Sequence, residues 1–208
     1  MHVRRKIGFS MFLISAVIGT QNVSAQNVVE ITSVDVGMLY IHAWDTHGPG
    51  LEARVGFSLP GMWLGLRHEV ALAAQMATTH GTVAAIGQYD RTFRSGGVIW
   101  RSTFAGLGRS VQPYILVPVL LARSGLELGE EYWPAYASST MLYHDLPPVH
   151  HNGTHWGACF GLGGGTELHL TRHLHFDLSG TLLYPTIFDD RRLIKTVRIG
   201  LAFGGGRW

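Results

Sequence analysis

The residues of this chain that could carry out chemistry are charged side chains that occur one at a time within apolar segments. Both signs are nearly balanced, with 16 Lys and Arg against 14 Asp and Glu. The charges share the less apolar face of these segments: Glu52, Arg54, Arg67, Glu69, Arg101, Glu167, Asp177 and Arg198. Isolated Arg and carboxylate groups can pair in an enclosed space and satisfy each other's hydrogen bonds. We therefore predict a structural charge network and no catalytic residues.

Histidines form a second candidate group, in one long connecting segment with an acidic neighbour: His144, Asp145, His150, His151 and His155. Imidazoles at this density can bind Zn²⁺ or Cu²⁺. Their spacing is irregular, however, and Pro147-Pro148 stiffens the segment. We interpret it as a His-rich surface loop, and we predict no metal and no other cofactor.

Two further motifs carry no chemistry by this interpretation. The stretch GLGGGTE (161–167) is not a phosphate-binding loop, because it lacks a following Lys and lies inside an alternating segment. Cys159 is the only cysteine, so no intramolecular disulfide can form. We expect its thiol to face the interior and to be unreactive.

Residues 1–25 have the features of a secretory signal peptide. Arg4, Arg5 and Lys6 precede an apolar stretch (7–19), and Val23-Ser24-Ala25 is typical of a cleavage site. A membrane-anchor helix is the alternative, but the apolar stretch is short for a span. We expect the mature chain to begin at Gln26 and to form one domain, residues 26–208.

The elements that must position the charges are short segments in which apolar and small or polar residues alternate, a pattern typical of β-strands. Charged residues make up only 14% of the 208 residues, and there are 27 glycines. The net charge of +2 gives no indication of nucleic-acid binding. The alternation predicts eight strands, at 31–44, 51–59, 62–72, 98–108, 113–123, 156–168, 175–184 and 196–203.

The predicted connections alternate between two lengths along the chain. Three are tight, at 58–62, 108–113 and 170–174, whereas four are long, at 45–50, 75–97, 125–155 and 187–195. An antiparallel meander with short turns at one end and long loops at the other produces this order. The predicted fold class is therefore all-β, an eight-stranded antiparallel up-and-down transmembrane β-barrel.

The direction of the two faces separates a membrane barrel from a soluble, lipocalin-like barrel, which stays the alternative. Lys is scarce on the charged face, which favours an enclosed lumen over a solvated surface. Gly161, Gly163 and Gly165 would leave room there for long side chains. Aromatic residues at predicted strand ends would form an interfacial girdle: Tyr40, Trp63, Trp100, Tyr114, Trp156 and Tyr184.

Three segments, PYILVPVLLARSG, WGACFGLGGGTELHLTRHLHFDLSGTLLY and VRIGLAF, make the chain resemble outer-membrane β-barrel proteins of the OmpA/OmpX type. The terminus, with Arg198, Gly200, Phe203 and an out-of-phase Trp208, resembles the signal that the barrel-assembly machinery reads. The resemblance implies an integral protein of the Gram-negative outer membrane whose partners are membrane lipids and that machinery. Its expected role is structural or surface-interacting, with extracellular long loops and an unknown surface ligand; a narrow channel is the alternative.

A lipid-modifying enzyme is the remaining alternative. A deacylase of this family would place a His-x-Ser pair on one lipid-facing strand, so that the imidazole could activate the hydroxyl. His68 lies on an apolar face, but residue 70 is Val, and neither Ser102 nor Ser179 has a His two positions earlier. We therefore predict no enzymatic activity and interpret His68 as an interfacial residue.

Overall fold

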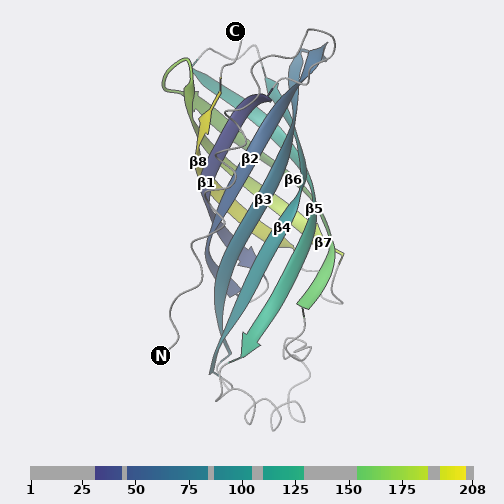
Figure 1. Ribbon diagram of the computed structural model, residues 1–208, viewed down its shortest axis with the longest axis vertical. Coiled ribbons are helices and arrows are strands. Elements are labelled where there is room, and N and C mark those ends of the chain that lie inside the picture. The colour runs from purple at the N-terminus through teal and green to yellow at the C-terminus, as the bar shows by residue number, and fades with distance from the viewer. Residues whose placement is uncertain are drawn as a thin grey trace, which may run out of the picture.

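The computed structural model describes residues 31–43, 46–83, 87–104, 110–128, 154–186 and 193–204, which form a closed β-barrel (Figure 1). Its strands are β1 (Ile31–Ala43), β2 (Thr46–Trp63), β3 (Leu66–Val83), β4 (Gly87–Phe104), β5 (Val111–Leu128), β6 (Thr154–His169), β7 (Leu174–Pro185) and β8 (Ile194–Phe203). Each pairs antiparallel with the next, and β8 pairs with β1. The eight-stranded up-and-down fold is thus confirmed. The described residues include no helix long and apolar enough to cross a membrane.

Several sequence predictions lie outside the described residues. These are the signal peptide (1–25), the residues before Ile31, and the end of the chain with Trp208. Most of the His-rich segment is also outside them, including His144, Asp145, His150 and His151, whereas His155 lies in β6.

The alternation read from the sequence becomes an alternation between the inside and the outside of the barrel. In β8 every second residue from Ile194 to Ala202 is buried, and the residues between them are exposed. In β1 the exposed residues include Val36 and Met38, and the buried ones include Leu39 and Ile41. Successive strand side chains point to opposite faces, so closing the sheet sends one set inwards and the other outwards.

The expected long connection at 75–97 is wrong, because β3 continues to Val83 and β4 begins at Gly87. The two strands pair without interruption from Leu66↔Phe104 to Val83↔Gly87. Outward Thr78 and His80 alternate there with inward Ala77 and Thr79, so neither face is strongly apolar. On β4 the inward face here contributes the buried rings of Tyr89 and Phe93, but two aromatic residues are too few to give a clear hydrophobic periodicity. Residues 46–50, also expected to be loop, likewise belong to β2.

The tight turn expected around Pro60 is also misplaced. β2 runs on to Trp63, with an irregularity in its register between Ser58 and Met62. The chain reverses at Leu64-Gly65, where the φ angles are 55° and 72°. Two consecutive positive φ angles match a type I′ hairpin turn, whose twist suits the adjoining strands. The expected tight turn at 170–174 is present between β6 and β7.

The barrel interior has two regions. Near the end with the tight turns, the upper end in Figure 1, inward residues are charged, as with Asp35 and Arg198. From the middle towards the other end the interior is mainly apolar, with buried Leu39, Ile41, Phe93, Leu120, Leu183 and Ile194. Among the described residues of this second region, Arg91 on β4 is also a buried charge.

Leu64 provides a direct test of the turn geometry. A left-handed conformation costs a residue with a Cβ about 1–2 kcal/mol, and Asn tolerates it better. Leu64→Asn should therefore raise the free energy of unfolding by about 1 kcal/mol, measured by urea titration of the refolded protein.

Leu170→Asn is the matched control, because Leu170 is also an exposed turn leucine but has no positive φ. It should leave stability nearly unchanged. Equal effects of the two substitutions would contradict the turn assignment.

Candidate functional site

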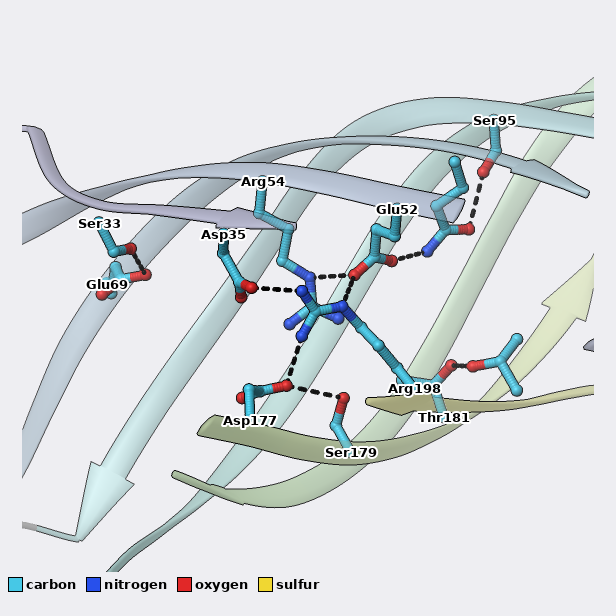
Figure 2. A network of polar contacts seen from close by, with 12 residues as sticks. Ser33, Asp35, Glu52, Arg54, Glu69, Ser95, Asp177, Ser179, Thr181 and Arg198 are labelled. Atoms are coloured by element: carbon cyan, nitrogen blue, oxygen red, sulfur yellow. Dashed lines mark hydrogen bonds and ion pairs between the residues drawn. The ribbon is translucent and has the colours of Figure 1, made fainter. Parts of the chain in front are cut away.

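The centre of the interior charge network is the guanidinium group of Arg198, which is 1% exposed and contacts carboxylates on three other strands (Figure 2). Nη1 lies 2.5 Å from an oxygen of Asp177 on β7 and Nε lies 2.7 Å from Glu52 on β2. Nη2 donates to Asp35 on β1. One planar cation thus connects β8 to β7, β1 and β2 across the inside of the barrel.

Glu52 extends this network towards β3 and β4. Its carboxylate pairs with Arg54, two residues along the same strand, and accepts a hydrogen bond from the amide of Gln75. The other end of the Gln75 amide accepts a 2.9 Å hydrogen bond from Ser95. Buried charges are stabilised only when their remaining hydrogen bonds are also satisfied, and this chain of partners supplies several of them (Figure 2).

Arg101 on β4 forms a second cluster nearby. Its Nη2 lies 3.1 Å from Glu69 on β3 and 3.1 Å from Glu167 on β6. Its guanidinium carbon lies 5.3 Å from the centroid of the Tyr114 ring, and the Tyr114 hydroxyl donates to Asp177. Tyr114 therefore connects the Arg101 cluster to the Arg198 cluster.

Two glycines make room for Arg198. Gly37 on β1 and Gly200 on β8 face each other where the barrel closes. A Cβ on Gly200 would lie 2.5 Å from Nη2 and 2.7 Å from Cζ of Arg198, and one on Gly37 would lie 2.9 Å from that Cζ. Because three carboxylates hold the guanidinium in place, it could not move aside without loss of ion pairs.

The structure places seven of the eight predicted charged residues in two groups. Glu52, Arg54, Asp177 and Arg198 meet around one guanidinium, and Glu69, Arg101 and Glu167 meet around another. Arg67 is half-buried at the start of β3, opposite Thr103.

Sequence reasoning missed several members of the network, including Asp35, Gln75 and Ser95. Asp35 alternates with apolar Val34 and Val36, so the strand pattern already carried its signal. Tyr114 was expected in an outward aromatic girdle, and this is wrong: it is 2% exposed and points inwards. Its strand is apolar on both faces, which hides the direction of each side chain. Cys159 is buried, as its expected position implied.

A polar cluster also lies on the outward face. His68 on β3 and Ser102 on β4 are opposite each other, with Nδ1 and Oγ 3.0 Å apart. The indole N–H of Trp100 lies 3.0 Å from the same Oγ and 3.3 Å from Nδ1. The His-x-Ser pattern does not detect this pair, because its two residues lie on different strands and only the register brings them together.

Comparison with known proteins identifies the fold. No protein-family model matches the chain, and no curated protein matches it in sequence. Neisserial surface protein A superposes with a TM-score of 0.52 at 13% identity, over 83% of this chain and 95% of that one. This chain has the fold of the OmpA/OmpX-type outer-membrane β-barrels. Ail of Yersinia pestis, in complex with the heparin analogue sucrose octasulfate, gives 0.50 at 11% identity over 83% and 96%.

Gly200→Ala tests whether this outer-membrane-type barrel depends on the space around Arg198. Overpacking a filled interior typically costs about 1–3 kcal/mol, and we expect a loss of that size in the free energy of unfolding, measured by urea titration.

Gly180→Ala is the matched control, because a Cβ there would lie no closer than 3.5 Å to any neighbouring atom. It should change stability by less than about 1 kcal/mol. A Gly200→Ala protein as stable as the unmodified chain would show that the guanidinium is not fixed.

Proposed function

We propose that this protein is an integral β-barrel of the outer membrane with a structural or surface-interaction role and an interior closed by ion pairs. The observation that carries this proposal is the inversion of polarity, in which charges are buried and large apolar side chains are exposed. Exposed apolar residues occur on all eight strands: Val36, Met38, Leu51, Leu72, Met76, Val98, Val117, Val119, Leu121, Phe160, Leu162, Leu182, Val197 and Ile199. A continuous belt of this kind is unfavourable in water and favourable in lipid.

Aromatic side chains support the same placement. Tyr40, Trp156 and Tyr184 are exposed towards the end with the long connections, and Trp100 is exposed in the half with the tight turns. The guanidinium carbon of Arg123 lies 5.7 Å from the centroid of the Trp156 ring. Amphipathic rings favour the two membrane interfaces, where one side is apolar and the other hydrated. A soluble, lipocalin-like barrel has no membrane interface, so it would not favour exposed aromatic rings at these two levels.

A closed interior favours the structural role over a channel. Arg198 extends from β8 to Glu52 on β2, two strands away, and buried apolar side chains fill the interior beyond it. An eight-stranded barrel is only wide enough for its own side chains. We infer that the interior ion pairs connect the strands and stabilise the closed barrel.

The strands that project beyond the apolar belt are the best candidates for contact with a partner. β2, β3, β4 and β5 each have 18 residues, whereas about 9–11 residues suffice to cross a membrane. Their outward residues become polar towards the end with the long connections, where His80 lies 2.7 Å from Asp90. We infer that this end is extracellular and that surface contacts use these strand ends with the segment 129–153.

Assembly into the membrane would require the barrel-assembly machinery. Phe203, at the end of β8, is 54% exposed and lies on the lipid-facing side under this proposal. The terminal strand also closes the barrel through β1, so its insertion and the closure of the sheet are coupled.

A charged substitution within the belt tests this proposal. Arg at a lipid-facing position near the bilayer midplane costs about 2–4 kcal/mol. Leu162 is 62% exposed in the middle of β6. Leu162→Arg should therefore lower the free energy of unfolding by about 2–4 kcal/mol, measured by urea titration of the protein in phospholipid vesicles.

His80→Arg is the control, because it places the same side chain on the projecting hairpin and can keep the ion pair with Asp90. Its effect should be small. If both substitutions are equally tolerated, the belt faces water and the membrane proposal fails.

A second candidate function, a lipid-modifying enzyme, is favoured by the His68–Ser102 contact. If Nδ1 accepts the Ser102 proton, Oγ could attack a lipid ester carbonyl, and the alcohol would leave with a proton returned from the imidazole. The pair lies close to the tight-turn end of the belt. Glu69, the neighbouring carboxylate, points inwards to Arg101 and does not orient the imidazole as a triad acid would.

This second candidate predicts that a fluorophosphonate probe labels the unmodified protein, detected by intact-protein mass spectrometry. Ser102→Ala and His68→Gln should abolish labelling, because they remove the nucleophile and its base. Ser179→Ala should retain it, since Ser179 is a buried interior serine. An unlabelled wild-type protein would rule out a nucleophilic Ser102.

A further inference from the structure

Three side chains at the tight-turn end of the barrel form a cluster that the ion-pair network does not explain. Glu167 and His169 lie on β6, and His175 lies on β7 directly opposite His169. Glu167 and His175 are buried, at 5% and 4% exposure, and His169 is half-buried. The sequence analysis considers metal ligands only among the histidines of segment 144–155, and it predicts no metal there.

The geometry of the cluster is close to that of a metal site. One ligand atom from each of the three side chains lies within 4.8 Å of the others. Nδ1 of His175 is 3.4 Å from Oε1 of Glu167, which is long for a hydrogen bond. Tetrahedral Zn²⁺, with ligand bonds of about 2.0–2.2 Å, separates neighbouring ligand atoms by about 3.4 Å. The His169 and His175 ring centroids are 4.2 Å apart, so a modest ring rotation would bring in the third ligand.

Arg101 orients the carboxylate without occupying the oxygen that faces His175. It pairs with Oε2 of Glu167 at 3.1 Å, whereas Oε1 is the atom near the imidazole. Partners that hold the second oxygen of a ligating carboxylate are a regular feature of metal sites. Arg101 also pairs with Glu69, and Asp177 lies opposite Glu167, so carboxylates offset the positive charge nearby.

We propose that Glu167, His169 and His175 bind a divalent transition-metal ion, with Zn²⁺ as the best match. Two imidazoles and one carboxylate form a ligand set that Zn²⁺ prefers, and the fourth position would hold water. His169 is partly exposed beside the turn 170–173, so an ion can enter from this end. Because its ligands come from both strands, the bound ion would link β6 to β7 next to the turn that connects them. This inference does not depend on where the barrel resides.

The test is titration of the purified, refolded full chain with ZnCl₂ by calorimetry, with visible absorption of Co²⁺ as a report of tetrahedral coordination. The unmodified protein should bind one ion at this site. His169→Gln and His175→Gln should each weaken that binding by at least about tenfold. Zn²⁺ should also raise the thermal midpoint of the unmodified protein but not that of His169→Gln.

Two controls separate this site from other histidines. His173→Gln changes an exposed histidine in the same turn, and a His150→Gln/His151→Gln double variant removes imidazoles from the His-rich segment. Both should keep the site's affinity and the Co²⁺ spectrum. Binding that survives His169→Gln and His175→Gln, or that disappears in the double variant, would overturn the proposal. If His175→Gln fails to refold, His169→Gln decides, since its partly exposed side chain is less important for packing.

Discussion

Closure of the sheet between β1 and β8 is the constraint on which every other feature of this protein depends. The two strands pair from Val34↔Phe203 to His42↔Lys195, so each of the eight described strands has a neighbour on both sides. Once the ring is closed, each side chain must point either into a narrow interior or out to the surroundings. The ring also brings Asp35, near the start of the described chain, to Arg198, near its end.

The narrow interior explains why glycine and arginine occur together. The Arg198 guanidinium fits inside the barrel because two residues next to it, Gly37 on the neighbouring β1 and Gly200 on β8 itself, have no Cβ. The guanidinium in turn needs several carboxylates, because an unpaired buried charge is strongly destabilising. Residues from four strands thus provide the room for the Arg198 guanidinium and the carboxylates that pair with it. One hairpin alone could not provide both.

The inward and the outward face of the barrel carry different groups of polar side chains, and each group suits a different function. The inward face near the tight turns contains the ion pairs and the Glu167, His169 and His175 cluster, whereas the outward face carries the apolar belt and the His68–Ser102 pair. The inward groups are suited to connecting the strands through ion pairs and to binding a metal ion. The outward pair lies beside the Trp100 ring, and the His68 side chain is buried there.

Prediction from the sequence succeeded where the apolar alternation is strong and failed where it is weak. Strands such as β8 were located closely because Val197, Ile199 and Leu201 mark one face. The sequence predicts a loop beyond Met76, because the β3 residues there are mostly polar or small on both faces and β4 adds only inward Tyr89 and Phe93 to the apolar pattern. Pro60 suggested a turn, but the chain reverses at Leu64-Gly65, because a two-residue hairpin turn requires positive φ rather than proline.

The sequence by itself determined the number of strands, their order and the separation of apolar from charged faces, because a period of two is a local property of the chain. Only the tertiary structure decided which groups meet. Asp35 with Arg198, His68 with Ser102, and His169 with His175 are brought together by strand register and by the closure of the ring. Register depends on the pairing of whole strands, so residue spacing along the chain does not contain it.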